Sequence, residues 1–235
     1  MARHAQLNNI DHRDLRVVTE RGAAWGDDVM SALTFPGEFR NLQACYPIVF
    51  QKAADGSFQP VALLGFQTGQ NLFLDERGWD ALYLPLAIER QPFLIGLSVE
   101  GEPMMHIDLD HPRVGKTHGE PLFRTHGGTT EFLDRMASTL QALHEGLQAV
   151  PGFVDALLRH DLLESFVLDI TLDDGAQHRL AGFYTINEER LSRLDGEALA
   201  ALHVEGHLEA IYMAIASLSR FRDLIERVRR AQGHA

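Results

Sequence analysis

The chain has 235 residues, of which 45% are hydrophobic, so it is long enough to bury a core as one domain or as two closely packed subdomains. Its formal net charge of -12 opposes a phosphate backbone, and we therefore expect no nucleic-acid partner. Cys45 is the only cysteine, which excludes an intramolecular disulfide and any zinc site built from several thiolates.

The N-terminal segment, MARHAQLNNIDHRDLRV, is polar and charged throughout and lacks the apolar stretch of a signal peptide. No apolar run approaches the roughly 18 residues that a membrane span needs. From the sequence we therefore expect a cytoplasmic protein that does not insert into a membrane.

From residue 14 to about residue 109, short β-branched and aromatic runs alternate with turn residues, a pattern typical of strands. These runs are LRVVTE, CYPIVFQ, FQPVALLGF, NLFL, PFLIGLSV and MMHIDLD. Asp55-Gly56 lies between the second and third runs, and this dipeptide is typical of a hairpin turn. The N-terminal half is therefore predicted to form a mostly antiparallel sheet.

After residue 128 the apolar residues recur every three or four positions, which predicts a helix. Thr129 or Thr130 can cap its start, and VPGFVDALLRHDLL predicts a second, shorter helix. The predicted apolar face of the first helix contains Phe132, Leu133, Met136, Leu140, Leu143 and Leu147.

The C-terminal half also contains a predicted hairpin, ESFVLDITLDDGAQHRLAGFYTI, which turns at Asp174-Gly175. Asn187 and Asp195 are expected to cap further helices, and a last helix over about 207–230 places Tyr212 on a broad apolar stripe. The expected fold class is α+β, as one domain over residues 1–235. Its parts would be a β-rich subdomain over 1–125 and a helix-rich subdomain over 126–235 that includes the hairpin 164–186.

The segment PMMHIDLDHPRVG, residues 103–115, suggests an iron site. His106-x-Asp108 matches the start of the two-histidine, one-carboxylate motif that holds Fe(II) in non-haem oxygenases. His178 could supply the second histidine, and Arg190 follows it at a spacing that suits the carboxylate of 2-oxoglutarate.

Residues 129–160 oppose this interpretation, because they are predicted to be helical where such an oxygenase needs strands between its two histidines. The other interpretation is an ordinary strand with alternating faces. Met105, Ile107 and Leu109 would then face the core, while His106, Asp108 and Asp110 face water. On that interpretation the chain needs no cofactor.

The central segment, GQNLFLDERGWDALYLPLAIERQPFLIG, mixes aromatic residues and arginines within a mainly apolar run. Tryptophan, tyrosine and arginine dominate the energetic centres of protein interfaces. We therefore predict a surface that binds a ligand or a partner, formed by Asn71, Arg77, Trp79, Tyr83 and Arg90. No residue of the chain is assigned a catalytic role.

Residues 38–225 resemble the SapC family of bacterial proteins. The resemblance rests on YPIVF at 46–50, on PVALLGF, and on the run NLFL, GW, YLP and PF. It continues in LFRTHGGTTEFL at 122–133 and in the helical C-terminal part that begins GFYTINEERL. The resemblance implies a link to a paracrystalline surface layer, or to nutrient uptake beside TonB-dependent receptors and genes similar to halogenases and cupin-like oxygenases. It supplies no established catalytic residues, and it is the only reason to place the protein at the cell surface.

Three functions follow as expectations. The first is a non-enzymatic accessory protein that binds a protein, peptide or small molecule in a surface-layer or uptake context. The second is an enzyme, either an oxygenase that uses Fe(II) and 2-oxoglutarate or one that modifies amino acids or peptides. The third is a structural subunit of a surface layer, which would form a homo-oligomer.

Overall fold

The computed structural model describes residues 3–97, 101–171 and 177–233. The chain divides into two compact units, and each unit is assembled from three separate segments. Unit 1 contains residues 1–28, 74–80 and 86–145, and unit 2 contains residues 29–73, 81–85 and 146–235. Both units combine helices with antiparallel strands, so the predicted α+β class is confirmed.

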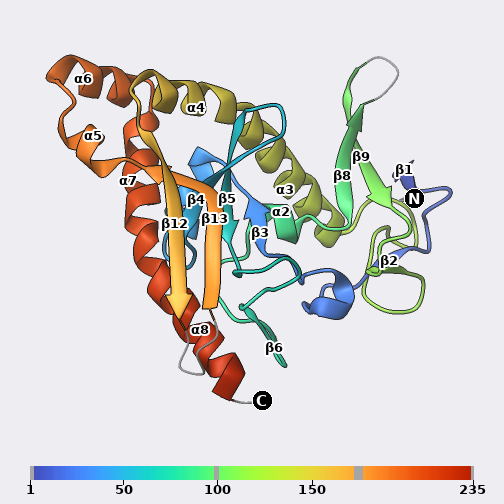
Figure 1. Ribbon diagram of the computed structural model, residues 1–235. Coiled ribbons are helices and arrows are strands. Elements are labelled where there is room, and N and C mark those ends of the chain that lie inside the picture. The colour runs from blue at the N-terminus through green and yellow to red at the C-terminus, as the bar shows by residue number, and fades with distance from the viewer. Residues whose placement is uncertain (1–2, 98–100, 172–176, 234–235) are drawn as a thin grey trace. The chain divides into compact units, whose positions relative to one another are not determined.

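The strands of unit 1 form three small antiparallel sheets. The first has the order β1 (His4–Gln6), β9 (Pro103–Asp108), β8 (Phe93–Leu97), as Figure 1 shows. The second has the order β10 (Val114–Gly115), β2 (Arg16–Val17), β11 (Glu120–Pro121). The third is the hairpin of β6 (Leu74–Asp75) and β7 (Gly78–Trp79).

The helices of unit 1 are a 3₁₀ turn at Ala23–Trp25, the short α2 (Leu86–Glu89) and α3 (Glu131–Gln148) as far as Glu145. The Thr130 Oγ1 accepts the N–H of Leu133 at 3.2 Å, so Thr130 caps α3 as the sequence predicts. The N-terminal part of the predicted apolar face of α3, from Phe132 to Leu140, packs into the core of unit 1. This core contains Leu15, Val17, Phe93, Ile107, Leu122, Phe132, Leu133, Met136 and Leu140.

Two of the predicted strands are much shorter than expected. Of LRVVTE, only Arg16 and Val17 belong to a strand, and of NLFL only Leu74 does. In the second case the Asn71 Oδ1 accepts the N–H of Phe73 at 3.0 Å, which forms a turn. A local side-chain bond therefore competes with the extended backbone that the apolar residues favour.

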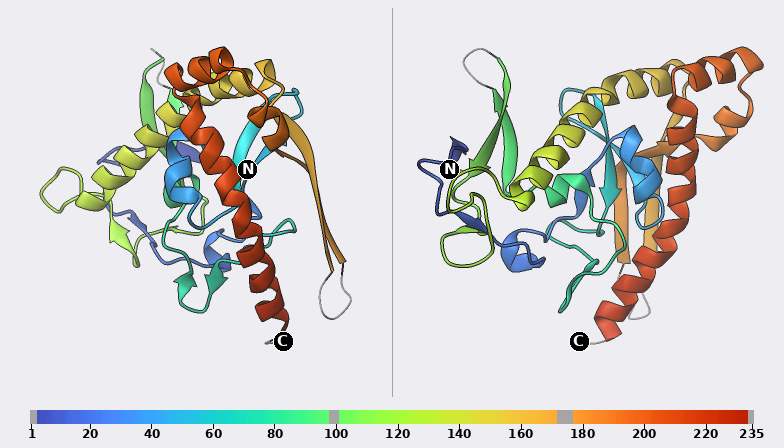
Figure 2. Two further views of the ribbon diagram at one scale, coloured as in Figure 1. Left: turned by 90° about the vertical axis from the view of Figure 1, so that its left-hand side faces the viewer. Right: turned by 180° about the vertical axis from the view of Figure 1, so that it is seen from behind.

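Unit 2 is built on one antiparallel sheet of five strands. Its order is β12 (Leu163–Thr171), β13 (Gln177–Ile186), β4 (Ile48–Lys52), β5 (Phe58–Leu63), β3 (Ser31–Leu33). The β4–β5 pairing confirms the predicted hairpin at Asp55-Gly56, and the β12–β13 pairing confirms the second hairpin, at the outer edge of the sheet in Figure 2. The predicted turn residues of that second hairpin, Asp174-Gly175, lie outside the described residues.

The helices of unit 2 flank this sheet. They are α1 (Phe39–Leu42) after a 3₁₀ turn at Pro36–Glu38, α4 (Val150–Arg159), α5 (Glu188–Ser192), α6 (Gly196–Val204), α7 (His207–Ser217) and α8 (Phe221–Gly233). Helix α7 packs against β13 and β4, as Figure 1 shows, and α4 packs against β5. The predicted caps are confirmed, because Asn187 Oδ1 accepts the N–H of Arg190 at 2.7 Å and Asp195 Oδ1 accepts the N–H of Ala198 at 2.9 Å.

The predicted last helix is interrupted by a 3₁₀ turn at Leu218–Arg220. Before this turn, the Ser217 Oγ donates to the carbonyl of Ala214 and accepts the N–H of Ile48 at 2.9 Å. Such a bond from a serine to the preceding turn bends a helix. The expectation that Tyr212 lies on the apolar stripe is wrong, since this side chain is 51% exposed. Among the described residues, no helix has the length and apolar character to cross a membrane.

Candidate functional site

The recognition segment, residues 71–90, contains the five residues predicted to bind a ligand or partner. Asn71 and Tyr83 belong to unit 2, whereas Arg77, Trp79 and Arg90 belong to unit 1. These side chains differ in exposure, because only Arg77 is fully on the surface and the other four are half-buried. The prediction that they form a single recognition surface stays a prediction.

Within unit 1, the segment begins with the tight β6–β7 hairpin. Asp75 Oδ1 accepts the N–H of Arg77 at 2.7 Å, and Gly78 has a φ of 110°, a left-handed conformation that favours glycine. Trp79 pairs with Leu74 across this hairpin. The local sequence Asp-Glu-Arg-Gly thus forces a turn that presents the Arg77 side chain to solvent.

Within unit 2, Tyr83 is anchored by a buried carboxylate. Its hydroxyl donates to Glu38 Oε1 at 3.0 Å, and the hydroxyl of Thr34 donates to Glu38 Oε2 at 2.6 Å. The hydroxyl of Tyr46, two residues before β4, donates to the main-chain carbonyl of Tyr83. Because Glu38 is only 2% exposed, these bonds offset the cost of burying its carboxylate and fix the backbone at Tyr83.

Leu82 lies directly before this anchor and is 100% exposed. A partner that buried this side chain would gain about 1.5–3 kcal/mol of hydrophobic free energy. Sequence reasoning missed Leu82, because an apolar residue within YLPL predicts burial.

Asn71 and Arg90 make hydrogen bonds that stabilise the local backbone. Asn71 makes the turn to Phe73 described above. The guanidinium of Arg90 donates to the carbonyl of Phe93 at 2.6 Å, and burial lowers its pKa from the ordinary value. Both residues therefore position the ends of the recognition segment.

The iron-site residues lie on β9 and β13. His106 and Asp108 are two residues apart on β9 and so share a face. The His106 ring lies over Gly96, where a Cβ would come within 2.5 Å of its Nε2, and Asp108 Oδ1 accepts the N–H of Asp110 at 3.1 Å. His178 pairs with Ile170, but its side chain lies outside the described residues.

The core-facing half of the alternating-strand interpretation is confirmed, but of the residues expected to face water only Asp110 is exposed, whereas His106 and Asp108 are half-buried. Ile107 is fully buried in the core of unit 1, and Met105 and Leu109 pack against that core. Arg190, the expected partner of 2-oxoglutarate, forms an ion pair with Asp161 at 3.0 Å. Within the described part of the chain, no three His, Cys, Asp or Glu side chains are grouped closely enough to hold a metal. The iron hypothesis therefore stays a prediction.

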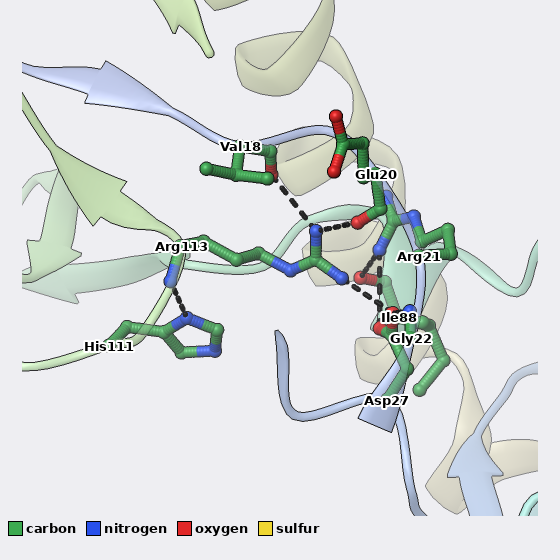
Figure 3. Close-up of polar contacts among 8 residues, drawn as sticks. All are labelled: Val18, Glu20, Arg21, Gly22, Asp27, Ile88, His111 and Arg113. Carbon is green, nitrogen blue, oxygen red and sulfur yellow. Dashed lines mark hydrogen bonds and ion pairs between the residues drawn. The ribbon is translucent and has the colours of Figure 1, made fainter. Parts of the chain in front are cut away.

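A buried ion cluster in unit 1 was not predicted from the sequence (Figure 3). The side chains of Arg113 and Asp27 are both 0% exposed, and Arg113 Nη2 lies 2.6 Å from Asp27 Oδ2. Arg113 Nη1 also donates to the carbonyl of Val18 at 2.9 Å, and Arg21 lies 3.5 Å from Asp27 Oδ1. Burial, and then the charge of Arg113, lowers the pKa of Arg21. Arg113 and Asp27 are 86 residues apart in the chain, and no local sequence pattern predicts an ion pair between them.

Comparison with protein families finds a match over most of the chain. The SapC family matches residues 7–224 of the chain, which is most of its length. No curated protein and no solved structure was found to match.

Proposed function

The chain belongs to the SapC family, and from this premise we propose that it is a non-enzymatic accessory protein that binds a partner protein or peptide through the recognition segment. The context that we propose is a surface layer or nutrient uptake at the bacterial envelope.

The observation that carries this proposal is the full exposure of Leu82 beside the anchored Tyr83. Small-molecule sites are concave and enclose most of their ligand, whereas a side chain that is 100% exposed has no such enclosure. A protein or peptide surface can cover it. The apolar area that a partner would remove from water supplies the driving force, at about 25 cal/mol per Å².

Residue types that lie a few positions earlier in the sequence also support a protein partner. Trp79 is half-buried and Arg77 is exposed, and tryptophan and arginine are enriched at the energetic centres of interfaces. Because Tyr83 is held by Glu38 and Tyr46, the main chain next to Leu82 is already ordered before binding. Less conformational entropy is then lost when the partner binds.

The experiment is site-specific photo-crosslinking in cells that produce the protein. A photoreactive benzoyl-phenylalanine replaces Leu82, and the matched control carries it at Val204, another apolar residue of unit 2 that is 84% exposed. We expect one discrete crosslinked product from position 82, absent from position 204, that decreases in the Arg77→Ala and Trp79→Ala variants. Its mass distinguishes a second copy of this chain from another protein. Identical patterns from positions 82 and 204, or no product from position 82, would contradict the proposal.

A further inference from the structure

Unit 1 contains an open groove of about 670 Å³ whose lining includes four cationic side chains. Arg13, Arg16, Lys116 and Arg124 line it, with Asp14 as the only acidic residue and Phe123 among its apolar residues. We call this site the basic groove. Its volume lies within the range of small-molecule sites.

The charge of the basic groove contrasts with the charge of the whole chain. Four cations against one carboxylate leave a local excess of positive charge, although the chain has a formal net charge of -12. Like charges that line one groove repel one another, so this arrangement costs free energy in the absence of a counterion. The lining therefore favours an anionic ligand.

Two of the arginines are held in place by main-chain carbonyls. Arg13 Nη2 donates to the carbonyl of Thr125 at 3.1 Å, and Arg16 Nη1 donates to the carbonyl of Gly119 at 2.8 Å. Each guanidinium has five N–H donors, so further donors remain for a ligand. Because these side chains are already ordered, less rotamer entropy is lost on binding.

The other two cations have no such bond. The side chains of Lys116 and Arg124 are exposed, and neither donates to another group among the described residues. Their full donor capacity is open to a ligand. The basic groove thus combines two anchored guanidiniums with two free cationic groups.

The fold brings these residues together through the β10–β2–β11 sheet. Arg16 on β2 pairs with Gly115 on one side and with Pro121 on the other, and Lys116 follows Gly115 directly. Two residues further along the chain from Arg16, the Arg113 guanidinium donates to the carbonyl of Val18 (Figure 3). The main-chain carbonyl of Arg113 also accepts the N–H of Val18 at 2.9 Å. The lining is therefore supported by a buried ion cluster.

From this arrangement we propose that the basic groove binds a small polyanion that carries at least two phosphate or carboxylate groups. One oxyanion can accept a bidentate pair of bonds from one arginine, so three arginines and a lysine suit more than one such group. A small ligand fits better than a long polyanion, because the net negative charge of the rest of the chain repels any part that extends beyond the groove. This proposal does not depend on the recognition segment.

The experiment is calorimetric titration of the full chain with two probes, tripolyphosphate and citrate, at constant ionic strength. The test variant is Lys116→Gln with Arg124→Gln, because neither side chain supports the fold. The matched control is Lys52→Gln with Arg222→Gln, which removes the same charges from exposed positions of unit 2. Thermal unfolding of each variant verifies that it is folded.

We expect at least one probe to bind with a Kd below about 1 mM, and the test variant to weaken that binding at least about tenfold. The control should stay within about twofold of the wild type. Raising the salt concentration from about 50 to about 300 mM should weaken binding to the wild type more than to the test variant. Preference for one probe would identify the ligand as phosphate-bearing or carboxylate-bearing. No saturation by either probe up to about 10 mM, or equal losses in the test variant and the control, would overturn the proposal.

Discussion

Arg113 donates to Asp27 in the interior of unit 1, with Nη2 and Oδ2 2.6 Å apart and neither side chain exposed. The second oxygen of Asp27 faces Arg21 at 3.5 Å, so one carboxylate is shared by two guanidiniums. Asp27 Oδ2 also accepts the N–H of Gly22 at 2.8 Å. Removal of this single carboxylate would leave two cations together in a region with little access to water.

Asp27→Ala should therefore destabilise the protein by about 3–5 kcal/mol, as measured by urea unfolding, because it leaves the charge of Arg113 buried and uncompensated. The control is Glu189→Ala, which breaks the exposed ion pair between Glu189 and Arg193. That pair should contribute at most about 1 kcal/mol. Similar losses in the two variants would refute a stabilising role for the buried carboxylate.

The stability of unit 1 should depend on the protonation of His111. The Nδ1 of His111 accepts the N–H of Arg113 at 3.2 Å, so this nitrogen has no proton in the folded chain. Burial, and then the charge of Arg113, lowers the pKa of His111, while Asp108 and Asp27 act in the opposite direction. As the pH falls below about 6.5, the unfolded chain takes up the proton first, and the folded state loses stability until the folded pKa is passed.

The measurement is the difference in unfolding free energy between the wild type and His111→Asn, from about pH 7.5 to about pH 5. The asparagine Oδ1 can accept the same N–H but cannot titrate. The wild type should lose more stability than the variant as the pH falls. Parallel pH profiles would count against the assignment to His111.

Gly146 of α3 lies against the ring of Phe35 in unit 2, where a Cβ would stand 2.2 Å from Phe35 Cδ2. Gly146→Ala should destabilise the protein by about 1–3 kcal/mol, because the buried ring must move. Gly152→Ala in α4 is the matched change, since its Cβ would meet nothing within 4 Å. Alanine there should stabilise the helix by about 0.5–1 kcal/mol.

A second substitution tests the cause. Phe35→Leu in the Gly146→Ala background should recover part of the loss, which a double-mutant cycle would detect as an interaction energy. Additive effects would mean that the ring of Phe35 is not what opposes the added methyl group. Chemical denaturation of the wild type, each single variant and the double variant supplies all four corners of the cycle.

The iron hypothesis is tested by elemental analysis of protein that is purified without chelators. We expect no stoichiometric iron, and we expect His106→Ala to leave the metal content unchanged. One iron per chain that is lost in both His106→Ala and Asp108→Ala would instead support the oxygenase. The control is His203→Ala, at an exposed position of α6.

Local sequence signals predicted the elements that depend on neighbours along the chain. The period of the apolar residues predicted α3, and the Asp-Gly dipeptide predicted the β4–β5 hairpin. Asn187 and Asp195 marked two helix starts, because a cap bonds an N–H only three residues away. The same local reasoning overestimated the length of the strand at NLFL. There the hydrogen bond accepted by the Asn71 side chain outweighs the strand preference of its neighbours.

The sequence by itself determined the α+β class, the main helices and hairpins, and the resemblance to the SapC family, because periodicity, turn residues and caps act over a few residues. Only the tertiary structure decided that Arg113 is buried against Asp27, that Leu82 is exposed beside Tyr83, and that four cations share one groove. The ion pair and the groove bring together residues that are far apart in the chain. The exposure of Leu82 depends on which other residues pack around it. Their free energies come from desolvation and from charge pairing in three dimensions, which no local pattern records.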